Sequence, residues 1–159
     1  MNPFEFFIPQ NIIVGAGTLV RLPECAQKLG GTHAMLLSGP TLRKMGIVDK
    51  AAKYLEDAGM KVDIFTEIEA NPSVTTVEKA TTAFKEVGAD FIVALGGGSP
   101  MDVAKAVGVT AKYGGSIAEY EGAHKVPGKI IPLIAIPTTA GTGSEVTAFS
   151  VITDHSRDY

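Results

Sequence analysis

Residues 90–107 read DFIVALGGGSPMDVAKAV, and this stretch places three consecutive glycines between an apolar run and a helical pattern. The run at 90–96 is continuously apolar, as strands covered on both faces of a sheet are. The pattern after the glycines predicts a helix to about Lys112, with Ser99 as its N-cap and Asp102 completing a capping-box-like S-x-x-D. A buried strand that turns through glycine into a helix is the kind of junction at which open α/β sheets bind ligands.

Outward from this stretch, apolar runs of strand type alternate with helical patterns. This order implies right-handed crossovers and a mostly parallel sheet, so we predict a single α/β domain with helices flanking the sheet. The opening run 6–15 predicts one or two extended segments, and 145–154 alternates like a strand or hairpin arm. The remaining predicted strands are 33–38, 61–66 and 132–138, and the remaining predicted helices are 18–31, 49–59 and 73–88.

The composition is that of an ordinary globular chain. Of its 159 residues, 45% are hydrophobic and 19% are charged, which is enough apolar material for a core. The formal net charge of -3 and the lack of a lysine or arginine run argue against nucleic acid as a partner. The single cysteine, Cys25, cannot form an internal disulfide, and we find neither a signal pattern nor an apolar run of membrane-spanning length. We therefore expect a cytoplasmic protein with no membrane partner.

The three glycines admit two explanations. Free N–H groups and the dipole at a helix start favour an anion, and missing side chains let a diphosphate approach the backbone. The alternative is a tight strand–helix turn without a ligand. The spacing matches neither G-x-G-x-x-G nor the P-loop pattern, so neither of those labels applies.

A second loop favours the ligand over the empty turn. The stretch IPTTAGTGSEVT, residues 136–147, also follows a predicted buried strand and is rich in hydroxyls and glycines. Small donors without bulk suit a phosphate and ribose surface, whereas the alternative is a flexible solvated loop. Two such loops at strand ends predict a nucleotide-binding cleft.

The motifs GGGSPMDVAKA (96–106), IPTTAGTGSE (136–145) and NPS (71–73) resemble the iron-containing (group III, metal-dependent) alcohol dehydrogenases, which include propanediol dehydrogenases and lactaldehyde reductases. The resemblance implies that residues 1–159 are an N-terminal, Rossmann-like NAD(P)-binding domain. In the family a second, helical domain supplies the metal ligands, one aspartate and three histidines. The histidines of this chain, His33, His124 and His155, lie outside the matching motifs. Iron or another divalent metal is therefore expected only in a full-length parent.

The resemblance also assigns cofactor-binding residues. It implies that Gly97, Gly98 and Ser99 hold the diphosphate and that Asp102 lies near the nicotinamide end. Asp102 also has a structural explanation as a helix cap, and the two roles are compatible. Asn71, which would approach the cofactor from a neighbouring strand end, could equally be only a turn former. Three threonines would line the ribose–phosphate path and three further residues would lie under the nicotinamide half: Thr138, Thr139 and Thr142, then Thr147, Phe149 and Val151.

One position departs from the pattern of NAD-preferring members, which usually carry an aspartate after the first strand. Gly39 stands there in this sequence. Without that carboxylate a 2′-phosphate meets no repulsion and has room, so NADP is favoured, with NAD or dual use as the alternative. The nearby donors are Ser38, Thr41, Arg43 and Lys44.

These inferences lead to three hypotheses about function. The first is the cofactor half of an NAD(P)-dependent, metal-dependent alcohol dehydrogenase that interconverts alcohols or diols and aldehydes or ketones by hydride transfer. The chain ends after a strand and turn signal at Asp154, so we expect a piece of a longer enzyme that is inactive alone; the alternative is a natural end on an edge hairpin. The other hypotheses are a stand-alone dinucleotide-binding module and an oligomerising α/β domain with empty loops.

The opening stretch FEFFIPQNIIVGAG (4–17) is rich in β-branched and aromatic residues, and a sheet edge there needs covering. We therefore expect a homodimer, as the family resemblance also implies. The alternative is an ordinary edge strand on a monomer.

Overall fold

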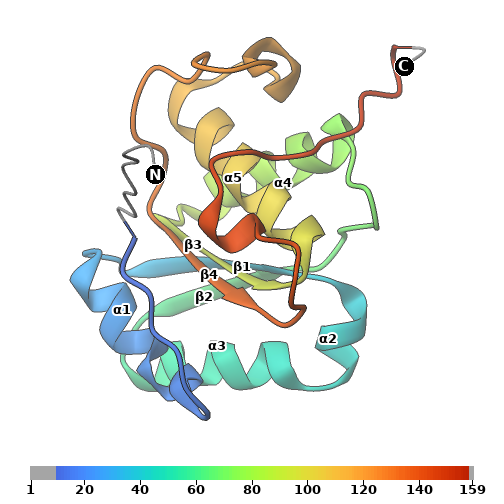
Figure 1. The fold of residues 1–159 in the computed structure, drawn as a ribbon. Coiled ribbons are helices and arrows are strands. Elements are labelled where there is room, and N and C mark those ends of the chain that lie inside the picture. Colours follow the sequence, from blue (N-terminus) through green and yellow to red (C-terminus); the bar gives the residue numbers. More distant parts are fainter. Residues whose placement is uncertain (1–9, 158–159) are drawn as a thin grey trace, which may run out of the picture.

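Four parallel strands form the centre of the structure, a computed structural model that describes residues 10–157. Their order in the sheet is β2-β1-β3-β4, and helices cover both faces (Figure 1). The predicted α/β fold with a parallel sheet and flanking helices is therefore confirmed. The strands are β1 His33–Ser38, β2 Lys61–Phe65, β3 Phe91–Gly96 and β4 Leu133–Pro137.

The strands alternate their side chains between two cores, because successive residues of a strand point to opposite faces. Leu36 and Val93 face α1 and α3, whereas Leu37 and Ile92 face α4 and α5. All of β3 is buried, which explains its uninterrupted apolar sequence. The helices are η1 Thr18–Arg21, α1 Leu22–Lys28, α2 Pro40–Lys44, α3 Ile47–Asp57, α4 Val74–Val87, α5 Gly98–Tyr113, η2 Ile117–Tyr120 and η3 Ser144–Val146.

The side of the sheet to which new strands are added changes between β1 and β3, while all strands stay parallel. The crossover through α3 carries the chain from β1 outward to β2, and the crossover through α4 returns it past β1 to β3. These two helices lie on opposite faces of the sheet (Figure 1). The carboxyl ends of β1 and β3 thus form the crevice in which open α/β sheets bind ligands.

Helix α4 begins as the sequence predicts. The Ser73 side chain accepts a hydrogen bond from the Thr76 amide at 3.2 Å, which makes Ser73 the N-cap. The helix ends at Gly88, whose φ of 74° is a left-handed conformation that glycine adopts without strain. Among residues 10–157, no helix combines the length and the apolar character that a membrane span needs.

The predicted strand at 145–154 and the described part of the predicted opening segment are not strands. Within 145–154 the structure has the short helix η3 and one isolated bridge, between Ser73 and Thr153. The segment instead bonds to α5, since the Ser150 hydroxyl donates to the Asp102 carbonyl oxygen at 2.7 Å. Residues 6–9 of the predicted opening segment lie outside the described residues, and 10–15 form no strand.

Candidate functional site

Two loops leave the carboxyl edge of the sheet side by side. The glycine loop, residues 96–99, follows β3, and the threonine loop, residues 138–143, follows β4. Gly96 is paired with Pro137 in the parallel register, and the Thr138 amide donates to the Gly96 carbonyl oxygen at 2.9 Å. The loops therefore begin at the same level on adjacent strands.

The glycine loop contacts the threonine loop with bare backbone. A Cβ atom on Gly97 would lie 3.2 Å from the Thr139 hydroxyl oxygen, and one on Gly98 would lie 3.8 Å from the Thr142 side chain. At Gly96 a Cβ would lie 2.9 Å from the Pro100 ring, and the φ of 147° excludes other residues there. Without side chains at these glycines the two loops pack closely beside the start of α5, and a helix start reached through such bare backbone is suited to a diphosphate.

The start of α5 differs from the predicted capping box. The N-cap is Gly97, in an extended conformation without a side-chain cap, and the helix begins at Gly98. Ser99 is thus already helical, and Asp102 lies too far into the helix to cap it. The prediction was wrong because an extended Gly97 lets the helix begin before Ser99. The early N–H groups of the helix have no intrahelical acceptor, which preserves the anion-binding character of this end.

Asp102 takes part in a different arrangement, together with Lys105 and Ser144. The Ser144 hydroxyl donates to Asp102 Oδ1 at 2.7 Å, and Lys105 Nζ donates to the Ser144 oxygen at 2.9 Å and lies 3.8 Å from Asp102 Oδ1. Burial lowers the pKa of the Lys105 ammonium below its ordinary value, whereas the charges of Asp102 and Glu145 raise it. Lys105 was missed by the sequence analysis, although its place one turn after Asp102 was a usable signal.

Further along the chain, two of the predicted nicotinamide residues bond to the same lysine. Lys105 Nζ donates to the Phe149 carbonyl oxygen at 2.8 Å and to the Thr147 hydroxyl at 3.3 Å. Phe149 and Val151 are 75% and 74% exposed, so they present apolar surface on the segment that follows the threonine loop. The segment passes over α5 in Figure 1.

Gly39 lies at the carboxyl end of β1, on the other side of the crevice. It is the N-cap of α2, and a Cβ placed on it would meet nothing within 4 Å. Of the four predicted donors nearby, Ser38 is unavailable because it is buried and its hydroxyl donates to the Leu95 carbonyl oxygen at 2.7 Å. Arg43 is exposed and pairs with Asp49 at 3.1 Å.

Asn71 is not joined to either loop by a hydrogen bond within residues 10–157. It lies in the connection from β2 to α4 with a φ of 55° and is exposed. This left-handed conformation is one that asparagine tolerates in turns, so its turn-forming role has direct support. The neighbouring Pro72 carbonyl accepts a hydrogen bond from the Thr153 amide at 2.8 Å.

The histidines do not gather. His33 Nε2 lies 2.6 Å from Asp63 Oδ2 at the opposite, amino-terminal edge of the sheet, and His124 and His155 lie in separate loop segments. Over the described part of the chain, no group of three or more His, Cys, Asp or Glu side chains could hold a metal ion. These residues therefore do not fit the iron site that the family resemblance implies.

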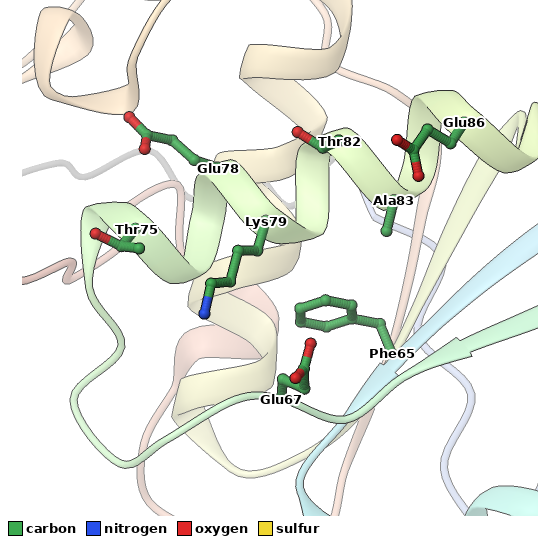
Figure 2. Close-up of a pocket in the computed structure, with 8 residues that line it drawn as sticks. All are labelled: Phe65, Glu67, Thr75, Glu78, Lys79, Thr82, Ala83 and Glu86. Atoms are coloured by element: carbon green, nitrogen blue, oxygen red, sulfur yellow. The ribbon is translucent and has the colours of Figure 1, made fainter.

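A hollow of about 420 Å³ lies elsewhere on the described surface. Figure 2 shows that it lies beneath α4, with Phe65 at its floor. Lys79 is opposed there by Glu67, Glu78 and Glu86, which would repel a diphosphate. The two loops therefore remain the better candidate site.

Comparisons with known proteins identify a family that the chain matches. The family described as iron-containing alcohol dehydrogenase matches residues 9–159. The chain is 38% identical to an NAD-dependent methanol dehydrogenase of Bacillus methanolicus over 153 residues, covering 96% of this chain and 40% of that protein. It is also 38% identical to an NADPH-dependent butanol dehydrogenase of Clostridium saccharobutylicum over 158 residues, covering 97% and 40%.

A solved structure shares the fold as well. The crystal structure of a 1,3-propanediol oxidoreductase superposes with a TM-score of 0.92 at 37% identity, covering 98% of this chain and 41% of that one. The chain thus spans about 40% of the length of the relatives that it matches.

Proposed function

The chain belongs to the iron-containing alcohol dehydrogenase family, and on that premise we propose that it binds a nicotinamide dinucleotide between the glycine loop and the threonine loop. It does so as the cofactor half of an NAD(P)-dependent enzyme that interconverts alcohols or diols and aldehydes or ketones. The observation that carries the proposal is the contact of Gly97 and Gly98 with the threonine loop through bare backbone, at the carboxyl edge of a parallel sheet. When bound, the dinucleotide supplies the hydride acceptor or donor.

The residues of the two loops have distinct parts in this proposal. The amides of Gly98 and Ser99 at the start of α5 bind the diphosphate, which the helix dipole further stabilises. Thr138, Thr139 and Thr142 line the path of the ribose and phosphate groups from the neighbouring strand. Asn71 at the β2–α4 turn is a further contact. On the nicotinamide side we assign four residues: Asp102, Thr147, Phe149 and Val151.

For the choice between the two dinucleotides, we propose that NADP binds at least as well as NAD. The open space at Gly39 can accept a 2′-phosphate, and the exposed Thr41, Arg43 and Lys44 are the donors within α2. The names of the relatives record both an NAD-dependent and an NADPH-dependent enzyme, so the family accommodates either choice.

We propose that hydride transfer to or from an alcohol needs residues beyond these 159. The described side chains do not form a metal site, and the relatives are longer than this chain. Metal and alcohol are therefore assigned to the full-length parent, and the chain alone acts as a dinucleotide-binding domain. The single cysteine supports a reducing, cytoplasmic setting for this role.

We further propose that the chain forms a homodimer through its N-terminal segment. Ile12, Val14 and Val20 are 50%, 89% and 57% exposed, which leaves apolar surface near that segment. Light scattering should give a dimeric mass that becomes monomeric when residues 1–10 are deleted. A monomeric mass for the intact chain would rule out the dimer.

Titration calorimetry tests the proposed function. NADP and NAD should each bind the 159-residue chain at one site, and Lys79→Met in the hollow beneath α4 should leave both affinities unchanged. If neither dinucleotide binds, the proposed function fails and the hypothesis of an oligomerising domain with empty loops takes its place. If both bind without alcohol turnover, the binding-module role is supported.

A further inference from the structure

Lys105 is a partly buried cation to which the proposed function assigns no role. Its side chain is 13% exposed and lies on α5, beneath the segment of chain that follows the threonine loop. Withdrawing an ammonium group from water is unfavourable unless hydrogen bonds and opposite charges replace the lost solvent. The hydrogen bonds that Lys105 makes here all go to one segment, residues 144–149.

Three acceptors of that segment converge on a single atom. Lys105 Nζ donates to the Ser144 hydroxyl at 2.9 Å, the Phe149 carbonyl oxygen at 2.8 Å and the Thr147 hydroxyl at 3.3 Å. An ammonium group has three protons to donate, so these bonds use its full capacity. The segment 144–149 forms no strand with the sheet. The Lys105 side chain instead bonds to both of its ends and to one residue between them.

The charges around Lys105 favour this arrangement over a free loop. Asp102 Oδ1 lies 3.8 Å from Nζ and accepts the Ser144 hydroxyl at 2.7 Å, so Asp102 and Lys105 hold Ser144 from two sides. Glu145 contributes a second negative charge, and its Oε2 is buried without a hydrogen-bond partner among the described residues. Removing the ammonium would leave the charges of Asp102 and Glu145 without the cation that interacts with both.

We propose that Lys105 is a positioning residue of the dinucleotide site, which holds segment 144–149 on α5 so that the nicotinamide half of the cofactor meets an ordered surface. The inference rests on the proposed function. Lys105 acts through the segment, because its bonds go to Ser144, Thr147 and Phe149 and none is left for the ligand. Phe149 lies at the end of this segment and Val151 lies two residues after it. Their exposed side chains form the apolar surface that Lys105 orders.

The test compares whole dinucleotides with ligands that lack the nicotinamide. Calorimetry is carried out with NADP and 2′-phospho-ADP-ribose, and with NAD and ADP-ribose, on the wild type and on Lys105→Met. The variant should lose roughly tenfold in affinity for the whole dinucleotides, as loss of hydrogen bonds to a charged donor implies, and less than about twofold for the truncated ligands. Lys105→Arg, which keeps the charge, should recover part of the loss.

Control variants separate this role from a general effect on folding. Lys112→Met removes an exposed lysine of the same helix and should change no affinity. If Lys105→Met does not fold, Ser144→Ala removes a single acceptor of Lys105 and should likewise weaken the whole dinucleotides more than the truncated ligands. Equal losses for whole and truncated ligands, or no loss, would overturn the inference, whereas a wild type that binds neither kind of ligand would instead overturn the proposed function.

Discussion

Replacing Gly98 with alanine should separate the binding of the dinucleotide from the stability of the fold. The added methyl group would lie 3.8 Å from the Thr142 side chain, an ordinary van der Waals contact, and Gly98 does not have a positive φ. Because alanine favours a helix over glycine by up to about 1 kcal/mol, the free energy of unfolding should stay the same or rise slightly. For a chain of this size the corresponding change in Tm is at most about +4 °C.

Binding should respond in the opposite direction. The methyl group would occupy the space that phosphate oxygens need to reach the amides of Gly98 and Ser99. Loss of a charge-assisted hydrogen bond costs about 1.5–3 kcal/mol, which corresponds to a loss of affinity of roughly 10-fold to 150-fold. Gly98→Val, with a bulkier side chain, should bind still more weakly.

Calorimetry with NADP and thermal melts followed by circular dichroism measure the two effects on the same samples. Lys79→Met, in the hollow of Figure 2, is the matched control and should change neither quantity. A folded Gly98→Ala variant that binds NADP within about twofold of the wild type would refute the reasoning that the bare backbone is a ligand cradle.

Three further predictions concern the cofactor, the chemistry and the pH dependence. Gly39→Asp should weaken NADP roughly tenfold in calorimetry through repulsion of the 2′-phosphate and should spare NAD; an equal loss for both would contradict the assignment. The purified chain should show no change in nicotinamide absorbance with alcohols or diols, even with added iron or zinc. Metal-dependent turnover would refute the assignment of metal and alcohol to the full-length parent. Burial raises the pKa of Asp90, but hydrogen bonds from Thr32 and His33 outweigh it and hold that pKa below its ordinary value. The stability from Asp90 is thus present above the unfolded-state pKa and lost as pH falls through the folded-state pKa, so Asp90→Asn should lower Tm at neutral pH and much less in strong acid; a pH-independent loss would contradict this.

The strands could be predicted closely from the sequence. The expected ranges 33–38 and 90–96 correspond to β1 His33–Ser38 and β3 Phe91–Gly96. Both are continuous apolar runs bounded by glycine or polar residues, and burial on two faces demands such runs. The order of the strands could not be predicted in the same way, because the crossover rule fixes handedness and leaves open on which side each strand is added.

Two of the three features that the sequence did not reveal depend on contacts distant in sequence, and the third depends on the backbone of one glycine. The alternation in 145–154 is typical of a strand, but a strand also needs a neighbour, and this segment bonds to Lys105 and Asp102 on α5 instead. Ser99 is a good N-cap by type, yet the extended backbone of Gly97 makes the helix begin earlier. The side chains of Asp102 and Ser144 meet only when β4 has brought the second loop against α5.

The location of the dinucleotide is the central claim, and it can be tested by titrating isotopically labelled protein with NADP while following the backbone amide resonances. The account predicts that the amides of Gly98, Ser99 and Thr142 shift first and most, and that those of Thr75 and Lys79 in α4 do not move. Unmoved resonances at the start of α5, or shifts centred on the hollow beneath α4, would contradict it.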